Sequence, residues 1–169
     1  GGGNDGIEIK VGSYGNVVRH NVIHDTTIGQ RFPCIFAYGG GSAVNTLEGN
    51  VMWNCGEAIQ VVSDAVIRNN IILNSDVGIT AAPHAQVAQM RNVTIANNTL
   101  YGHGECLFIR WSGATAMTLA NNAVYCPGAA AVNAPLDVKR AIWEHEKDEL
   151  IFDKRMGSAH LTDEQMAVA

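Results

Sequence analysis

The stretch VIRNNIILNSDVGITAA, residues 66–82, holds the pattern that decides the fold: an Asn with apolar residues on both sides, then a short β-rich segment. The Asn phrase occurs five times in the chain, as VVRHNVI (Asn21), LEGNVM (Asn50), VIRNNII (Asn70), VTIANNTL (Asn98) and MTLANNAV (Asn122). Successive asparagines are 29, 20, 28 and 24 residues apart. Spacings of this size are typical of one coil of a solenoid.

A second kind of segment precedes most of the Asn phrases. These segments are short, rich in β-forming residues and bounded by turn residues, which indicates strands rather than helices. They are GIEIKV (6–11), CIFAYG (34–39), EAIQVV (57–62), VGITAA (77–82) and ECLFIRW (105–111). Equivalent strands one coil apart must run parallel, because the chain returns to its start in every coil. The sequence predicts an all-β parallel solenoid of five to six coils, the sixth beginning at AAAVN, residues 129–133.

The repeated asparagines have a structural explanation. A tight bend favours a residue that tolerates left-handed backbone angles, and Asn is one of the few that does. Its amide can also bond to the Asn of the coils above and below, which satisfies polar groups at the bend. We therefore expect all five to form a ladder and to take no part in chemistry.

Composition limits the classes of protein. The chain has 169 residues, 47% of them apolar, and a mean hydropathy of +0.02. No stretch approaches the roughly 18 apolar residues of a membrane span. A net charge of −5 argues against a nucleic-acid partner, which requires a basic surface. The N-terminal GGGND lacks the features of a signal peptide, so we expect either a cytoplasmic protein or a mature or truncated form.

Charge is distributed unevenly along the chain. Residues 1–134 carry 14 charged side chains, and residues 135–169 carry 13. We therefore place a domain of stacked coils at 1–134 and a charged tail at 135–169. The sequence starts in the middle of a coil, so upstream coils are expected to be missing. Apolar residues of the tail lie at mostly helical spacing, namely Val138, Ile142, Trp143, Leu150 and Ile151. The tail is expected either to be helical and cap the last coil or to be foreign to the repeat.

The four cysteines, Cys34, Cys55, Cys106 and Cys126, lack the close pairing of a zinc site. They are expected to be small buried core residues, with disulfides as the alternative.

Alternation along the expected strands defines an inner and an outer face. The inward set is Ile7, Ile9, Ile35, Ala37, Ile59, Val61, Ile79, Ala81, Leu107 and Ile109; the outward set is Glu8, Lys10, Phe36, Tyr38, Gln60, Thr80, Phe108 and Arg110. Aromatic rings stack on sugars, and cations bind uronate carboxylates. The predicted substrate-binding residues are therefore Phe36, Tyr38, Phe108 and Arg110, with an acidic polysaccharide as the ligand. An ordinary solvated face is the alternative.

The pattern of a strand with Gly-Ile near its start, followed by an NxxxxNxI phrase, resembles the right-handed parallel β-helix repeats of the pectate-lyase-like superfamily. The resemblance covers residues 4–134. Proteins of this kind include lyases, polygalacturonases, tailspikes and inert surface proteins. Within them, the run EIK…GN…N…R is similar to the alginate lyase and chondroitinase B group. That resemblance implies a Lys10 base, an Arg31 that assists, and Asp5 with Glu8 as Ca²⁺ ligands. The chain departs from the group in the spacing before Arg31 and in having Phe32 after it.

The sequence motifs for other catalytic mechanisms are weaker. His24-Asp25 is expected to be a turn rather than an acid–base pair, and His103 a turn residue in a chain that lacks the carboxylate motifs of polygalacturonases. The functional hypothesis is a secreted, cell-surface or periplasmic protein that binds or cleaves an acidic polysaccharide by β-elimination. The alternatives are a noncatalytic surface, adhesion or glycan-binding module and a truncated fragment of a larger enzyme.

Overall fold

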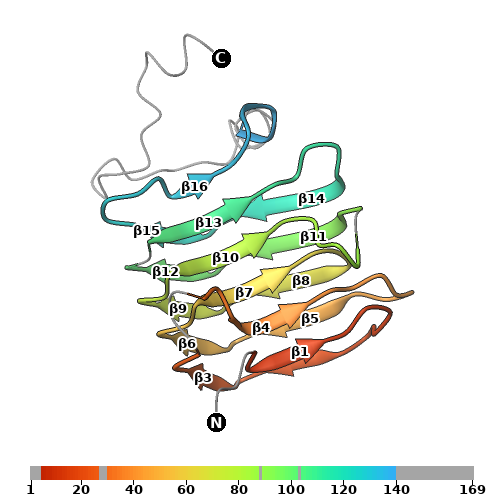
Figure 1. Ribbon diagram of the computed structural model, residues 1–169, viewed down its shortest axis with the longest axis horizontal. Coiled ribbons are helices and arrows are strands. Elements are labelled where there is room, and N and C mark those ends of the chain that lie inside the picture. The colour runs from red at the N-terminus through yellow and green to blue at the C-terminus, as the bar shows by residue number, and fades with distance from the viewer. Residues whose placement is uncertain (1–4, 27–29, 88, 103, 140–169) are drawn as a thin grey trace.

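A computed structural model describes residues 5–26, 30–87, 89–102 and 104–139. They form a solenoid of three parallel sheets, in which each coil gives one strand to each sheet (Figure 1). The front sheet contains β1 (Ile7–Ile9), β4 (Pro33–Ala37), β7 (Glu57–Val61), β10 (Val77–Ala81), β13 (Glu105–Ile109) and β16 (Val132–Asn133). The second sheet contains β2 (Val17–Arg19), β5 (Asn45–Glu48), β8 (Ala65–Arg68), β11 (Arg91–Ala96) and β14 (Thr115–Ala120). The third contains β3 (Val22–His24), β6 (Val51–Trp53), β9 (Ile71–Leu73), β12 (Thr99–Tyr101) and β15 (Ala123–Tyr125).

The predicted coil architecture is confirmed. Five coils, from β1–β3 to β13–β15, are complete within the described residues, and β16 begins a sixth. Each front strand lies within the segment expected for it or extends it by one residue at its start. The predicted strand positions were accurate because every coil must place the same kind of strand above that of the preceding coil.

The core is built from ladders of equivalent residues. Ile7, Ile35, Ile59, Ile79 and Leu107 are successive partners along the front sheet, and the ladder that starts at Ile9 ends at Ile109. Most of these side chains are fully buried. Burying an aliphatic side chain of this size stabilises the fold by about 2 kcal/mol, so the predicted inward set forms the main hydrophobic core.

The five asparagines form the expected ladder. In each coil but the last, the backbone N–H and Nδ2 of the ladder Asn donate to Oδ1 of the Asn one coil further, at 2.9–3.0 Å. The backbone expectation needs correction, because the left-handed residue is the one before each ladder Asn. These preceding residues are His20, Gly49, Asn69, Asn97 and Asn121, with φ between 52° and 62°. The bend and the ladder are therefore made by different residues.

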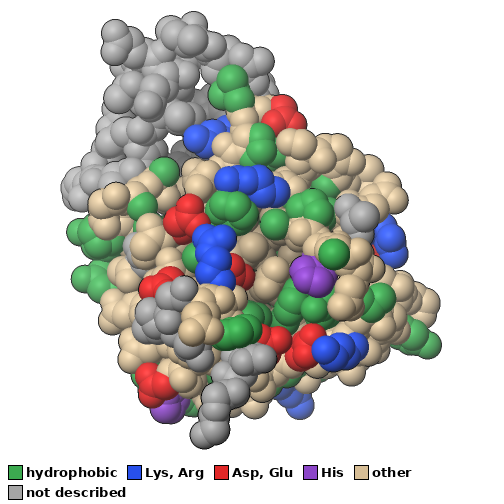
Figure 2. Space-filling view, in the orientation of Figure 1, with side chains coloured by type: hydrophobic (Ala, Val, Ile, Leu, Met, Phe, Trp, Pro, Cys, Tyr) green, Lys and Arg blue, Asp and Glu red, His purple; other side chains and the backbone are tan. Residues whose placement is uncertain are grey.

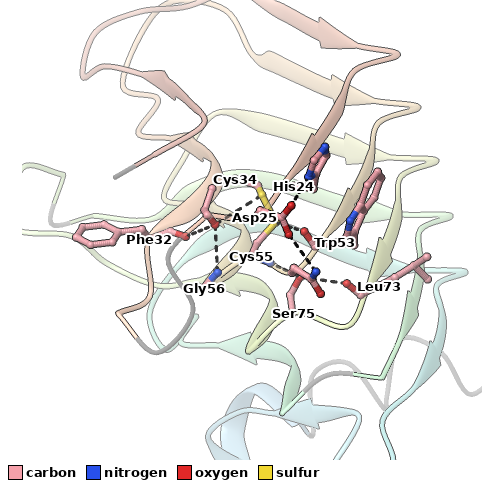
Figure 3. The surroundings of a disulfide bond; sticks show 11 residues. His24, Asp25, Phe32, Cys34, Trp53, Cys55, Gly56, Leu73 and Ser75 are labelled. Carbon is pink, nitrogen blue, oxygen red and sulfur yellow. Dashed lines mark hydrogen bonds and ion pairs between the residues drawn. A yellow bond between two sulfur atoms is a disulfide. The ribbon is translucent and has the colours of Figure 1, made fainter. Parts of the chain in front are cut away.

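The cysteines are fully buried, as expected, but they form two disulfides. Cys34 bonds to Cys55 and Cys106 to Cys126, with Cα atoms 5.8 and 6.0 Å apart. Each bond joins the front strand of one coil to the turn after the third strand of that coil. Figure 3 shows the first of them. The expectation of free core cysteines was wrong because burial alone does not distinguish a thiol from a disulfide that closes a coil.

The described part of the tail lies against the last coil. Residues 136–139 form a short helix, Val138 is buried in the core cluster, and Ser112 Oγ donates to Asp137 Oδ1 at 3.3 Å. The cap or foreign tail expected beyond it lies outside the described residues. Within the described residues, no helix is long and apolar enough to cross a membrane.

Candidate functional site

Charged side chains gather on the outer face of the front sheet. Figure 2 shows basic and acidic side chains side by side over the middle of this face. One outward ladder runs through Glu8, Phe36, Gln60, Thr80, Phe108 and Asn133, as successive register partners. Two clusters of charged side chains lie along it, one centred on Arg31 and one on Lys10.

The first cluster centres on Arg31, in the turn before β4. Its Nη2 donates to Glu105 Oε2 at 2.7 Å, and its Nε lies 3.7 Å from Glu57 Oε1. The turn itself is fixed to β7, because Glu57 N–H donates to the Phe32 carbonyl at 3.2 Å. Arg31 also has φ of 57°, which costs a residue with a Cβ atom about 1 kcal/mol. The local fold therefore holds one guanidinium between carboxyls from two coils.

Glu57 is the unusual member of this cluster. Its side chain is 4% exposed, and Oε2 is buried with no hydrogen-bond partner among the described residues. Burial is the largest cause that raises the pKa of this carboxyl, to about 7; Arg31 and then Thr80 oppose the rise, and Glu105 adds to it. The Thr80 hydroxyl lies outside hydrogen-bonding geometry, since Thr80 Oγ1 is likewise buried without a described partner. A carboxyl of this kind can take up or release a proton near neutral pH.

The pKa of Glu57 predicts a pH-dependent stability. An unfolded glutamate releases its proton near pH 4.5, whereas folded Glu57 holds it until about pH 7. This contribution is present below pH 4.5 and is lost as pH rises, so we expect the free energy of unfolding to fall by about 2 kcal/mol from pH 5 to pH 8. Urea unfolding at the two pH values should show this fall in the wild type, and a much smaller one in Glu57→Gln. Equal pH dependence in both proteins would contradict the assignment.

Phe108 and Arg110 lie beside this cluster. The Arg110 guanidinium carbon is 3.8 Å from the Phe108 ring centroid, and that of Arg31 is 5.3 Å away. Arg110 Nη1 also donates to the Asn133 carbonyl at 3.0 Å, while Asn133 Nδ2 donates to Glu105 Oε1 at 2.8 Å. Two of the four predicted substrate-binding residues, Phe108 and Arg110, therefore join Arg31 in one group, which we name the arginine cluster: Arg31, Glu57, Glu105, Phe108, Arg110 and Asn133.

Lys10 belongs to the second cluster, at the other end of the strands. Lys10 Nζ forms an ion pair with Glu8 Oε1, and a hydrogen bond to Glu8 is the largest cause that raises the pKa of Lys10. Its position follows β1 and lies next to Tyr38, which follows β4. Arg31 instead precedes β4 and pairs with the first residues of β7 and β13. The structure thus gives the two predicted catalytic residues different partners at opposite ends of the strands.

Phe36 and Tyr38 are not open to a ligand in this structure. Both are 5% exposed, and their rings stack at 3.9 Å between centroids. The His84 ring packs edge-on against them at 5.5 and 5.0 Å. The expectation that they present an outward surface is corrected, because the segment after β10 folds back over β4. The His84 ring covers them.

The predicted calcium ligands, Asp5 and Glu8, are too few to coordinate Ca²⁺ by themselves. Asp5 and Glu8 are close enough for Glu8 to raise the pKa of Asp5, although burial is the larger cause. Glu8 is already paired with Lys10. Among the described residues, no three His, Cys, Asp or Glu side chains form a group that could hold a metal. These donors do not by themselves fit Ca²⁺, which takes six to eight oxygen ligands, so the calcium site stays a prediction.

A comparison with known families agrees with this geometry. The family model described as "Right handed beta helix region" matches residues 1–124, most of the chain. The chain belongs to the right-handed β-helix family. No curated protein and no solved structure matches it. Membership supports a carbohydrate-active or surface β-helix protein in general, and the narrower resemblance to the pectate-lyase-like superfamily stays an expectation.

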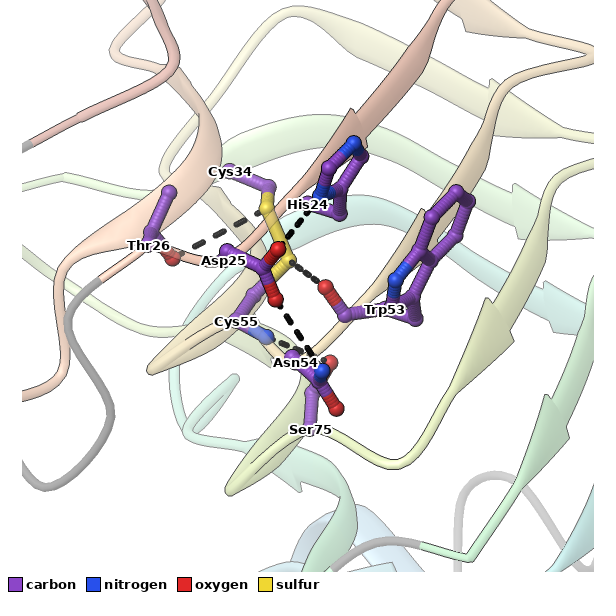
Figure 4. Close-up of polar contacts among 8 residues, drawn as sticks. All are labelled: His24, Asp25, Thr26, Cys34, Trp53, Asn54, Cys55 and Ser75. Carbon is purple, nitrogen blue, oxygen red and sulfur yellow. Dashed lines mark hydrogen bonds and ion pairs between the residues drawn. A yellow bond between two sulfur atoms is a disulfide. The ribbon is translucent and has the colours of Figure 1, made fainter.

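His24 and Asp25 form a contact on the third sheet of this β-helix. His24 Nδ1 and Asp25 Oδ2 are 2.7 Å apart, and Asn54 Nδ2 donates to Asp25 Oδ1 at 3.0 Å (Figure 4). Asn54 and then His24 lower the pKa of Asp25. Asp25 and Asn54 both have left-handed backbones, and the His24 ring stacks on Trp53 at 4.4 Å. The left-handed backbone recurs at Asn74 and Gly102 in the next coils, as expected of a turn, and this position lies on a different sheet from the arginine cluster.

Asn133, Glu57 and Glu105 of the arginine cluster were not identified from the sequence, and the two acidic residues among them share a position. Each is the first residue of its front strand, and Val77 lies between them in the register. The sequence does show an acidic residue at the start of EAIQVV and of ECLFIRW. Alignment of the β-helix coils on their front strands is the signal that could have paired them. His103 lies outside the described residues.

Proposed function

We propose that this β-helix binds an acidic polysaccharide across its front sheet and cleaves it by β-elimination. The observation that carries the proposal is the placement of Arg31 and Arg110 over the same Phe108 ring. An aromatic ring with two guanidinium groups suits a uronate sugar, because the ring can contact the sugar and the cations can pair with its carboxylate.

The arginine cluster has the parts that β-elimination requires. A cation must neutralise the uronate carboxylate, which makes the C5 proton easier to remove. A base must then accept that proton while the C4–O bond breaks. Arg110 is well placed for the first task, since its contacts with Phe108 and Asn133 fix its guanidinium. Lys10 follows β1, four front strands away from β13 and at the opposite end of the strands from Arg31, so a base for a sugar held by the arginine cluster must lie nearer to Arg31.

The disulfides support an extracellular or periplasmic location. Disulfides form and persist in oxidising compartments and are rare in the cytosol. Two of them close coils of this chain. A protein that meets a polysaccharide outside the cell would have this chemistry, so the proposed location and the proposed ligand agree.

Binding is expected to depend on the two arginines. Loss of a charged hydrogen bond commonly costs about 2 kcal/mol, so Arg110→Ala and Arg31→Ala should each weaken uronate binding by about tenfold or more. Calorimetric titration with sodium alginate, chondroitin sulfate and polygalacturonate measures this. Arg68→Ala is the matched control, because Arg68 pairs with Glu48 on the second sheet and is equally exposed. Unchanged binding in both front-sheet variants would contradict the placement of the ligand.

Cleavage is followed in the same samples by the ultraviolet absorbance of the new C4–C5 double bond. A rise in absorbance on one of the three polymers supports a lyase. Tight binding with no new absorbance, and with polymer length unchanged, would instead show a noncatalytic glycan-binding module. Absence of both binding and cleavage by folded protein would overturn the proposed function.

A further inference from the structure

Glu57 and Glu105 share Arg31 but differ in what their oxygens contact. Both oxygens of Glu105 are engaged, Oε2 by Arg31 and Oε1 by Asn133 Nδ2. Glu57 has one oxygen near Arg31 at 3.7 Å, while Oε2 has no partner among the described residues. Glu105 is therefore an anchor for the guanidinium, and Glu57 has an oxygen that is free to accept a proton.

The lack of a partner for Glu57 Oε2 is significant because this oxygen is buried. A buried carboxylate oxygen without a partner is uncommon in a folded protein, because the lost hydration costs about 1–3 kcal/mol. Thr80 Oγ1, on the next front strand, is also buried and unpartnered. Two unsatisfied polar atoms beside an exposed arginine indicate a place completed by a ligand that brings its own donors and acceptors.

From this geometry we infer that Glu57 is the base that removes the C5 proton of a bound uronate, and that Arg31 moves from Glu57 to the sugar carboxylate to uncover it. The inference rests on the proposed β-elimination. Arg31 is half exposed and its contact with Glu57 is the longer of its two ion pairs, so this contact is the easier one to exchange. The bond to Glu105 keeps the guanidinium over the site during the exchange.

The elimination needs no reactant other than the polymer and water. The Glu57 carboxylate takes the C5 proton, and the C5–H electron pair forms the C4=C5 double bond. The C4–O bond breaks, and its electron pair leaves on the oxygen of the departing sugar chain. That oxygen takes a proton from water, and Glu57 then returns its proton to solvent. A Glu57 pKa of about 7 leaves a substantial fraction of this carboxylate ionised at neutral pH.

The groups that face Glu57 determine the expected pH profile. They are Arg31 from the turn before β4, Thr80 from β10 and Glu105 from β13. A base must be ionised, so kcat/KM should fall as pH decreases through about 7. Activity that stays constant between pH 8 and pH 5 would overturn the assignment, whatever the behaviour of any variant.

The variant that tests the inference is Glu57→Gln, which keeps the shape of the side chain and removes the base. Cleavage of the polymer that the wild type degrades should fall by about 100-fold or more, with binding retained by calorimetry. Glu48→Gln is the matched control, because Glu48 is ion-paired to Arg68 on the second sheet; it should keep wild-type cleavage.

The outcomes separate the two proposals. Wild-type protein that cleaves no uronate polymer overturns the proposed function and the inference with it. A wild type that cleaves, together with folded Glu57→Gln protein that cleaves within about threefold of it, overturns the inference alone. If Glu57→Gln does not fold, the pH profile of the wild type decides the question.

Discussion

Replacing Asn70 with alanine should lower the free energy of unfolding by about 4 kcal/mol, a large fraction of the stability of a domain of this size. Asn70 is 1% exposed and stands at the middle of the ladder. It accepts from the backbone N–H and Nδ2 of Asn50, and its own Nδ2 donates to the Leu47 carbonyl and to Asn98 Oδ1. Its removal leaves buried donors and acceptors unpaired on both neighbouring coils.

The ladder supplies its own control for this prediction. Asn21 is at one end, partly exposed, and its side chain donates to Asn50 Oδ1 and the Arg19 carbonyl. Asn21→Ala should cost about 1 kcal/mol, because water replaces the lost partners. Urea unfolding followed by circular dichroism measures both variants. Equal losses at the two positions would contradict the claim that burial between coils makes the ladder strong.

Loss of both disulfides should destabilise the protein by about 6 kcal/mol, or about 3 kcal/mol for each. The bonds close segments with sequence separations of 21 and 20 residues, so each restricts the unfolded chain to a similar degree. Cys34→Ala/Cys55→Ala and Cys106→Ala/Cys126→Ala test them separately, because paired substitution leaves no lone thiol. Thermal unfolding is the measurement.

Chemical reduction provides the control for these variants. A reductant should lower the unfolding temperature of the wild type and of each double variant, and it should leave the quadruple variant unchanged. An unfolding temperature that does not respond to reductant in the wild type would show that the thiols are not bonded, and the cysteines would then be buried core residues.

The fold was largely predictable from the sequence because the pattern of one coil occurs five times. Alternation within each front segment identified the ladder from Ile7 to Leu107, and the asparagines marked one corner of every coil. The left-handed backbone was expected at each ladder Asn, whereas it lies at the residue before it. Several residue types fill that preceding position, His20 and Gly49 among them, so composition did not reveal it.

The candidate site was predictable only in part. Phe108 and Arg110 were identified by their chemistry. Lys10 and Arg31 were joined by a family resemblance, which does not tell at which end of a strand a side chain lies. Glu57 was missed because its partners come from different coils.

The outer surface was the hardest part to predict. Alternation places Phe36 and Tyr38 on the outside of the sheet, yet a later segment covers them through His84. The path of such a segment depends on packing between coils rather than on local pattern. For the same reason, the outward set had to be divided by the structure into residues that a ligand can reach and residues that it cannot.

The most direct test of the substrate site is a crystal structure of the Glu57→Gln protein with a bound uronate oligosaccharide. We predict a sugar carboxylate within hydrogen-bonding distance of Arg31 or Arg110, and C5 of that sugar beside the substituted side chain on β7. An oligosaccharide bound to the second or third sheet, or on the front sheet without contact to either arginine, would contradict the account.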